Sequence, residues 1–335
     1  MSLRDEIASE QRIAELEKTA ATLQRQLAAA KSKDADLVAA VEQAARDAAL
    51  ITGTVKPAKP PKRKTGKGKP EVGLLHLTDW QLGKRTESYD TTVAQVRVRK
   101  SIEKVLHLTD IQRAAHPVDE IVVMLGGDMV EGILFPGAAY EIDSSTFEQV
   151  FAAAHVLEEA ILTLLEHFSR VTVHSVNGNH GRIGKRGENP RGDNWDRVLY
   201  RIVRDKIGEH DRLAWPDPVS WYDIIEVGAY RALLVHGDQV KSFGGNTPAF
   251  GIMRKSTAWS SGVTEAFDDV YLGHFHSVMT LQLPNGGRVF MTPSLESGSE
   301  YAREFVAARG RPAQRLHYID PRDGRVTAEY VLWLD

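Results

Sequence analysis

The chain contains no cysteine, so it can form neither disulfides nor thiolate metal sites, and it cannot use a cysteine nucleophile. A chain without disulfides suits a reducing compartment, and we expect a cytoplasmic protein. No apolar run approaches the roughly 18 residues that a membrane-spanning helix requires. The charged N-terminus also lacks the apolar segment of a secretory signal. These absences predict no membrane partner.

An excess of charge of either sign is also missing. The 335 residues include 42 Lys and Arg against 45 Asp and Glu, which leaves a net charge of −3. The overall balance therefore gives no argument for a nucleic-acid partner. Hydrophobic residues make up 42% of the chain, enough to bury a core, and the length is typical of about two domains.

Glycine and proline are absent from residues 3–51, which are rich in Ala, Glu, Gln and Leu. Apolar residues recur there at alternating spacings of three and four from Ile13 to Ile51, and Asp34 is the exception in this repeat. A repeat of about 3.5 residues is typical of a coiled coil. We predict that residues 1–51 form a helix that mediates homo-oligomerisation or docks a partner protein. The alternative is a long amphipathic helix that folds back on its own domain.

Acidic residues are absent from residues 52–70, which hold six Lys, one Arg and four Pro. Such a segment cannot form a core, so we predict an extended, solvated linker. Its cationic side chains could contact the phosphates of a nucleic acid. The charge could equally serve only to keep a tether soluble, and the sequence leaves both interpretations open.

Residues 71–335 have a globular pattern. Apolar runs predict strands over residues 73–79, 120–128, 170–180, 222–227, 231–237 and 270–274. Apolar residues at helical spacing predict helices over residues 147–168 and 195–207. Turn residues at 284–287 and 321–324 predict two hairpins. Alternating strands and helices followed by a strand-rich region predict a layered α/β sandwich in one domain.

Polar clusters follow five of these strands. In chain order they hold Asp79 and Gln81, then Asp128, then Asn179 and His180, then His236, and last His274 and His276. The carboxyl ends of the strands in an open α/β sheet line the crevice where ligands bind. An extended backbone would place both imidazoles of residues 274–276 on one side, and Gln81 on the side of Asp79. Carboxylate, amide oxygen and imidazole suit Mn, Fe, Zn or Mg.

The ordered set of clusters resembles the calcineurin-like metallophosphoesterase superfamily, whose pattern is D-x-H, G-D, G-N-H, H and G-H-x-H. The resemblance covers about residues 73–280. It implies an α/β/β/α sandwich and two divalent metal ions. Mn²⁺ is the expected metal, and Fe, Zn and Mg are the alternatives. It also implies that Asp79 and His276 bind one metal and that Asp128 bridges both. Asn179, His236 and His274 would bind the other metal, and His180 would protonate the leaving oxygen.

The chain departs from the superfamily pattern at two positions. Gln81 stands where a His ligand is usual, and its amide oxygen is a weaker donor, so the first metal would be held loosely. Gly181 follows the G-N-H motif where an acidic residue is common, so the support for His180 would come from elsewhere. Two cations about 3.5–4 Å apart can clamp a phosphate and activate water as hydroxide.

Basic residues gather in the loop after the G-N-H motif, namely Arg182, Lys185, Arg186 and Arg191. We predict that they bind substrate phosphates, because Arg pairs bidentately with phosphate oxygens. A Gly-rich stretch at residues 241–247, with Arg254 and Lys255 beyond it, would add to this site. The alternative is a flexible surface loop with ordinary solubilising charges.

A narrower resemblance connects the chain with exonucleases of the DNA-repair type, including phage-encoded relatives. It rests on residues 76–83 (HLTDWQLG), 127–132 (GDMVEG), the basic loop and residues 299–303 (SEYAR). It implies a phosphodiesterase that cleaves nucleic acid. The alternatives are a phosphodiesterase or phosphatase for small molecules such as cyclic nucleotides, and a nucleic-acid-binding scaffold with a degenerate metal site.

Several other polar or aromatic residues are expected to have structural roles and not to bind metal or substrate. His76 and His174 lie in mid-strand and are expected to pack in the core. Trp80 could stack on a base, but packing is the favoured interpretation. Glu131 is expected to support the site or cap a loop, and Asp238 to support His236 rather than bind metal.

Overall fold

The computed structural model describes residues 57–61, 65–135, 141–217, 220–241, 248–297 and 310–335, together with residues 40 and 43. The coiled coil expected in residues 1–51 lies outside the described residues apart from those two positions, and it stays a prediction. Residues 299–303 and all but the first residue of the stretch 241–247 also lie outside. No helix in the described residues is long and apolar enough to cross a membrane.

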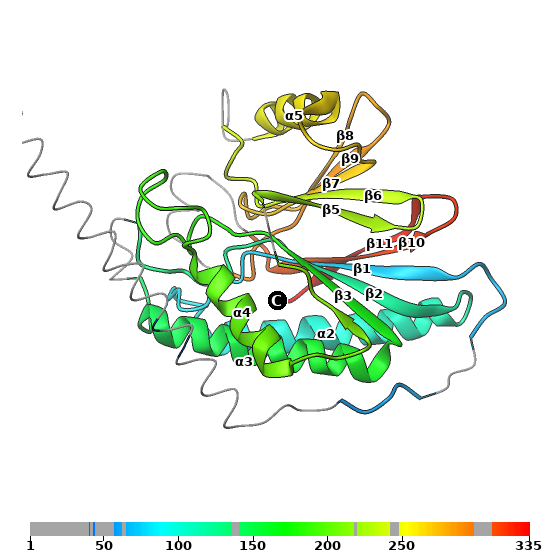
Figure 1. Cartoon of the computed structure of the whole chain (residues 1–335), viewed down its shortest axis with the longest axis horizontal. Coiled ribbons are helices and arrows are strands. Elements are labelled where there is room, and N and C mark those ends of the chain that lie inside the picture. The colour runs from blue at the N-terminus through cyan, green and yellow to red at the C-terminus, as the bar shows by residue number, and fades with distance from the viewer. Residues whose placement is uncertain are drawn as a thin grey trace, which may run out of the picture.

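Two mixed β-sheets pack face to face at the centre of the fold (Figure 1). The larger sheet has six strands in the order β11-β10-β1-β2-β3-β4. Its strands are β1 (Glu71–Leu77), β2 (Val118–Leu125), β3 (Arg170–Ser175), β4 (Leu213–Ala214), β10 (Ala313–Asp320) and β11 (Arg325–Trp333). Strands β1 to β4 run parallel, whereas β10 pairs antiparallel with β1 and places Leu316 opposite Leu75.

The smaller sheet has five strands in the order β5-β6-β7-β9-β8. They are β5 (Tyr222–Val227), β6 (Tyr230–Val235), β7 (Asp269–Leu272), β8 (Met279–Gln282) and β9 (Arg288–Met291). Strands β6, β7 and β9 run parallel, and β5 and β8 pair antiparallel at the two edges. The predicted turns join β8 to β9 and β10 to β11.

Helices cover the outer faces of both sheets, which gives the layer order α/β/β/α (Figure 1). The larger sheet is covered by α2 (Thr91–Arg113), α3 (Thr146–His167) and α4 (Trp195–Ile207), and the smaller by α5 (Ala249–Ala258) with the short turn η2 (Trp259–Val263). Helix α3 begins with a capping box in which Ser145 and Glu148 satisfy each other's backbone N–H groups. Asn194 caps α4 by accepting the N–H of Asp196.

Three sets of buried apolar side chains hold these layers together. Neighbours along β1 divide between two of the sets, because successive side chains of a strand point to opposite faces. Leu75 packs toward the helices, and Leu74 packs between the sheets. Phe147 and Phe151, which the helical spacing assigned to the apolar face of α3, are 37% and 49% exposed instead.

The end of the predicted linker differs from a free, solvated chain. Gly66 donates its N–H to the carbonyl of Arg113 (2.8 Å), and Lys69 pairs with Asp323 (2.7 Å). A Cβ at Gly66 would lie 2.2 Å from the carbonyl oxygen of Ala115, so only glycine permits this approach. Backbone pairing with the end of α2 therefore fixes residues 66–69 despite their charge.

Candidate metal centre

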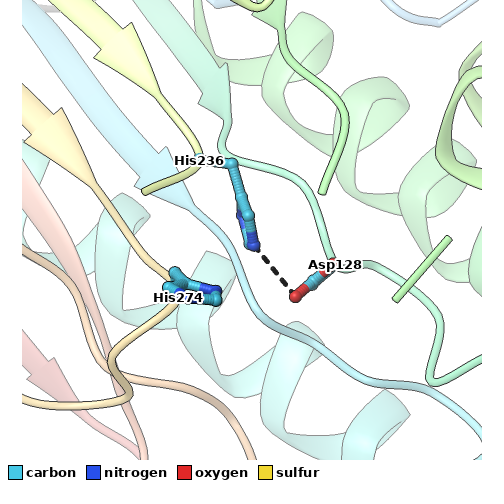
Figure 2. A group of neighbouring side chains, drawn as sticks. All are labelled: Asp128, His236 and His274. Carbon is cyan, nitrogen blue, oxygen red and sulfur yellow. Dashed lines mark ion pairs between the residues drawn. The ribbon is translucent and has the colours of Figure 1, made fainter. Parts of the chain in front are cut away.

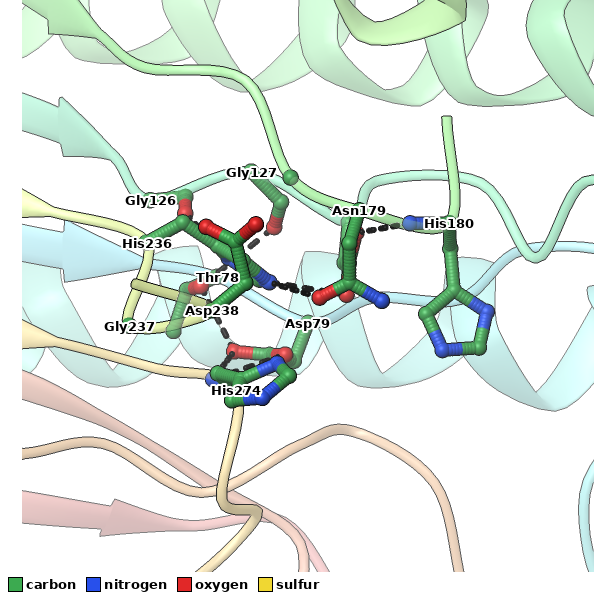
Figure 3. A network of polar contacts seen from close by, with 12 residues as sticks. Thr78, Asp79, Gly126, Gly127, Asn179, His180, His236, Gly237, Asp238 and His274 are labelled. Atoms are coloured by element: carbon green, nitrogen blue, oxygen red, sulfur yellow. Dashed lines mark hydrogen bonds and ion pairs between the residues drawn. The ribbon is translucent and has the colours of Figure 1, made fainter. Parts of the chain in front are cut away.

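The predicted ligands lie on five loops at the carboxyl ends of β1, β2, β3, β6 and β7. Strands β1, β2 and β3 are parallel in the larger sheet, and β6 and β7 are parallel in the smaller. Their carboxyl ends meet at one edge of the sandwich, and Figure 3 shows side chains from these loops turned toward one another. The topology thus gathers residues that are up to about 200 positions apart in the chain.

Five residues on these loops have a left-handed backbone: Asp79 (φ 51°), Gln81 (φ 47°), Asp128 (φ 53°), His274 (φ 65°) and His276 (φ 51°). Within the described ranges no other non-glycine residue has a positive φ. This conformation is rare for residues with a Cβ, and such strain gathers at functional sites. All five were predicted as ligands from the sequence.

The extended backbone expected at residues 79–81 and 274–276 is therefore wrong. Each strand ends two to four residues earlier, and the chain turns sharply where the loops hydrogen-bond to one another. The N–H of Asp79 donates to the carbonyl of Gly127, and that of Gln81 to the carbonyl of Asp128, both at 2.9 Å. The turns, and not the alternation of an extended strand, direct these side chains.

Asp128, His236 and His274 form a compact cluster (Figure 2). One ligand atom from each lies within 4.8 Å of the others, and the three residues are a candidate metal site. Nε2 of His236 is 3.0 Å from Oδ2 of Asp128 and 3.0 Å from Oδ1 of Asn179. Asp128 and His236 are fully buried.

The hydrogen bonds of His236 explain why this cluster suits a cation. Its Nδ1 donates to the carbonyl of Gly126 (2.8 Å), so Nε2 of the neutral ring carries a lone pair. In the neutral ring that lone pair faces the oxygens of Asp128 and Asn179, so three acceptors converge unless a proton or a cation lies between them. Oδ2 of Asp128 is buried and has no hydrogen-bond partner among the described residues.

A proton can take the place of a cation in this cluster. Burial alone would lower the pKa of His236, but the Asp128 carboxylate beside it raises that pKa to about 10. The charge of His236 in turn holds the pKa of Asp128 well below its usual range, despite burial. Burial and the neighbouring His236 lower the pKa of His274 to about 4, so His274 offers a neutral imidazole.

Asp79, Gln81 and His276 form a second group next to the first. Nε2 of His276 lies 3.3 Å from Oδ1 of Asp79 and 3.4 Å from Nε2 of Gln81. Asp79 is oriented by Thr78, whose hydroxyl donates to it at 2.6 Å, and by the N–H of His274 at 3.0 Å. Oε1 of Gln81 is buried without a partner in the described part of the chain, and a half-turn of the amide would aim this oxygen between imidazoles.

Nε2 of His180 lies 3.5 Å from Nε2 of Gln81. Figure 3 shows the His180 ring apart from Asp79, His236 and His274. Its Nδ1 is 3.1 Å from the carbonyl of Glu131 and 3.3 Å from the carboxylate of the same residue. Glu131 thus supplies the support that Gly181 cannot give. Burial alone would lower the pKa of His180, but Asp128 and Glu131 raise it to about 9, so the ring is protonated at neutral pH. Phe135 covers the ring, with 4.5 Å between centroids.

Asp196 holds two of the ligand loops together, a role that no motif in the sequence indicates. Its carboxylate is fully buried and accepts the N–H groups of Asp128 (2.9 Å), Met129 (3.0 Å) and Gly178 (2.8 Å). Burial and the nearby Asp128 raise the pKa of Asp196 to about 6. One side chain at the start of α4 therefore sets the backbone of both loops.

Lys84 and Glu296 form a buried ion pair that the sequence also did not indicate. Nζ of Lys84 lies 3.0 Å from Oε2 of Glu296, and the same oxygen is 3.6 Å from Nδ1 of His276. At that distance the Glu296 carboxylate lies beside the His276 ring without a hydrogen bond to it.

Two glycines allow the loops to come this close. A Cβ at Gly178 would lie 2.0 Å from Oδ1 of Asp128, and one at Gly273 would lie 1.9 Å from Oδ2 of Asp79. Both carboxylates would be displaced by any larger residue. The glycines that flank the polar clusters in the sequence therefore have a steric cause.

The four basic residues of the loop after His180 fall into two groups in the structure. Arg182 and Arg186 both donate to Oδ2 of Asp238, two residues beyond His236. Lys185 and Arg191 are exposed on the same loop. Arg254 and Lys255 lie on α5, which covers the outer face of the smaller sheet.

The residues expected to have structural roles mostly have them. Trp80 is fully buried in the core, which confirms packing over base stacking. His76 is buried between the sheets and bonds Thr292 at 2.8 Å. His174 pairs with Asp223 at 2.8 Å.

No protein-family model matches the chain, and no curated protein sequence matches it. Solved structures do match. One is Vps29 from Entamoeba histolytica, a crystal structure complexed with Zn²⁺, with 14% identity and a TM-score of 0.34 over 78% of this chain and 99% of that chain. Another is a predicted phosphoesterase from Streptococcus pneumoniae TIGR4, with 12% identity and a TM-score of 0.33 over 78% and 98%.

A third match is the phosphopantetheinyl hydrolase of Mycobacterium tuberculosis, with 11% identity and a TM-score of 0.31 over 71% of this chain and 94% of that chain. Similarity at this level transfers no residue roles. The roles assigned to the residues of this chain follow from their own geometry.

Proposed function

We propose that this chain is a metal-dependent phosphoester hydrolase of the calcineurin-like metallophosphoesterase type. The observation that carries the proposal is the convergence of three acceptor atoms, from His236, Asp128 and Asn179, in a buried cluster. Such a cluster is costly unless a proton on His236 or a bound cation offsets it, and a divalent cation would take the place of that proton. A half-turn of the Gln81 amide would bring its oxygen, which has no partner among the described residues, toward His276, where it could serve a second cation.

The two groups of residues fit two divalent cations. Asp128, Asn179, His236 and His274 would hold one, and Asp79, Gln81 and His276 the other, with Asp128 shared between them. The second set has only one imidazole and otherwise oxygen donors, which favours Mn²⁺. When bound, the cations would polarise the phosphoryl oxygens and lower the pKa of a water molecule.

His180 would protonate the leaving oxygen. Its raised pKa keeps it protonated at neutral pH, and its Nε2 faces the group that contains Gln81. Glu131 would hold the ring in place through Nδ1, so that Nε2 carries the proton that is transferred.

The substrate we propose is a phosphodiester of nucleic acid, which makes the enzyme a nuclease. The support is local charge, because Arg182 and Arg186 lie on the loop that follows His180. Arg is suited to phosphate oxygens by its planar fork of donors.

Purified protein with Mn²⁺ should be assayed on a chromogenic monoester, a chromogenic diester, cyclic nucleotides, and single- and double-stranded DNA. We expect diester and DNA cleavage that chelation abolishes. His180→Ala should reduce the rate roughly 10²–10⁴-fold while metal binding persists, which is the usual span for a general acid. His155→Ala, a half-exposed histidine on α3, serves as the control. Equal activity of the two variants would refute the role of His180, and cleavage of monoesters alone would refute the nuclease.

A further inference from the structure

Two arginines share one carboxylate beside the candidate metal centre. Arg182 and Arg186 donate to the same oxygen of Asp238, and Arg186 also donates to the Asp238 carbonyl at 3.0 Å. Asp238 lies two residues after His236, and its carboxylate is near enough to that ring to raise its pKa; Figure 3 shows both side chains on the same loop. We name Arg182, Arg186 and Asp238 the arginine cluster.

The backbone around Arg182 is fixed. Arg182 forms a β-bridge with Asn194, the residue that caps α4, and Gly181 accepts the N–H of Trp195 at 2.7 Å. A Cβ at Gly181 would lie 2.5 Å from the Asn194 side chain, so this part of the loop packs tightly against the helix start. The arginine therefore projects from a firm support only two residues after His180.

The charges of the arginine cluster do not balance. Two guanidinium groups carry two positive charges against one carboxylate, which leaves one positive charge in excess. The Asp238 side chain is only 11% exposed, whereas that of Arg186 is 60% exposed and that of Arg182 is 25% exposed. The carboxylate thus lies on the inner side of the cluster, and the Arg186 side chain is its most exposed part. One further anion would neutralise the cluster.

We propose that the arginine cluster is a subsite for a second phosphate group of a nucleotide chain, next to the phosphate that is cleaved. This inference rests on the proposed function and narrows its substrate class. A fork of guanidinium donors matches the planar pair of oxygens on a phosphate. The substrate would then carry at least two phosphates, which a cyclic nucleotide or a simple diester does not.

The test uses the full-length chain with Mn²⁺ and three thymidine dinucleotides. All have one internal diester, and they carry an added phosphate at the 5′ end, at the 3′ end, or at neither end. We expect one phosphorylated dinucleotide to be cleaved with the higher kcat/KM. Arg186→Ala should lower that preference about 10- to 100-fold, the range for loss of a charge-assisted hydrogen bond. The loss should lie in KM, because the second phosphate is remote from the reacting atoms.

Arg231→Ala is the matched control, since Arg231 is 48% exposed and paired with one carboxylate, that of Glu226. An equal loss of preference in this control, or no preference for either added phosphate in the native chain, would overturn the subsite.

Binding in EDTA separates the subsite from catalysis. Fluorescence anisotropy of a labelled, 5′- and 3′-phosphorylated oligonucleotide should show weaker binding to Arg186→Ala than to Arg231→Ala. Absence of hydrolysis of every dinucleotide, with this binding difference intact, would refute the proposed function and leave the phosphate subsite standing. Equal binding by both variants would refute the subsite.

Discussion

Replacement of Asp196 should weaken both the fold and the metal centre, although Asp196 is not placed among the metal ligands. Its carboxylate accepts three buried N–H groups, those of Asp128, Met129 and Gly178. An alanine at position 196 would leave all three donors without a partner. Each orphaned buried group costs about 1–3 kcal/mol, so the expected loss of unfolding free energy is roughly 3–9 kcal/mol.

Asparagine at the same position gives a graded version of this test. An amide oxygen at the place of Oδ2 would still accept from Asp128 and Gly178, but the NH₂ group would then face the N–H of Met129. The expected loss is that of one orphaned donor, about 1–3 kcal/mol. This variant keeps the prediction testable if Asp196→Ala does not fold, since a domain has only about 5–15 kcal/mol in total.

Urea unfolding in EDTA should give the order native, Asp196→Asn, Asp196→Ala. Mn²⁺ titration by calorimetry should show weaker binding to the folded Asn variant, because the Asp128 backbone loses part of its support. Stability of Asp196→Ala within about 1 kcal/mol of the native chain would refute the counting of orphaned donors. Native Mn²⁺ affinity in the Asn variant would refute its effect on the metal loops.

Three further predictions concern single residues. Gln81→His should lower the Mn²⁺ concentration for half-maximal activity and make Zn²⁺ more competitive, because imidazole is a stronger and softer donor; identical titration curves would remove Gln81 from the metal centre. Glu131→Gln should lower the pKa of His180 and move the alkaline limb of the kcat/KM profile to lower pH, and an unmoved limb would contradict their coupling. Burial holds the pKa of His317 well below 6.5, so the unfolded chain alone binds its proton. Its contribution to stability should be complete above pH 6.5 and fall by about 1.4 kcal/mol per unit below it; His317→Leu should flatten this slope in urea unfolding.

Local patterns were enough to predict much of the fold. Helix α4 begins at Trp195 and ends at Ile207, as its apolar spacing indicated, and β5 matches its predicted range. Helices α2 and α5 were not predicted. Their apolar residues are less segregated onto one face than those of α4, so the apolar stripe gives a weaker signal in the sequence.

The candidate site could be predicted only where a polar residue directly follows a predicted strand. The polar residues that follow strands were found because parallel strands end at a common edge. Lys84 and Glu296 could not be found, since their ion pair joins positions more than 200 residues apart and neither lies in a motif. Asp196 acts on backbone N–H groups of distant loops, for which a sequence carries no pattern. The left-handed turns were missed because side-chain alternation was assumed to continue past the strand ends.

The central claim is that the cluster around Asp128 holds metal and supports phosphoester hydrolysis. Calorimetric titration of Mn²⁺ into the metal-free native chain and Asp128→Asn, with bis(p-nitrophenyl) phosphate hydrolysis measured on the same samples, tests it most directly. We predict that the native chain binds two Mn²⁺ ions and that hydrolysis rises as they bind. The variant should lose both Mn²⁺ binding and hydrolysis. Hydrolysis that persists in EDTA, or Mn²⁺ binding and turnover unchanged in Asp128→Asn, would contradict the claim.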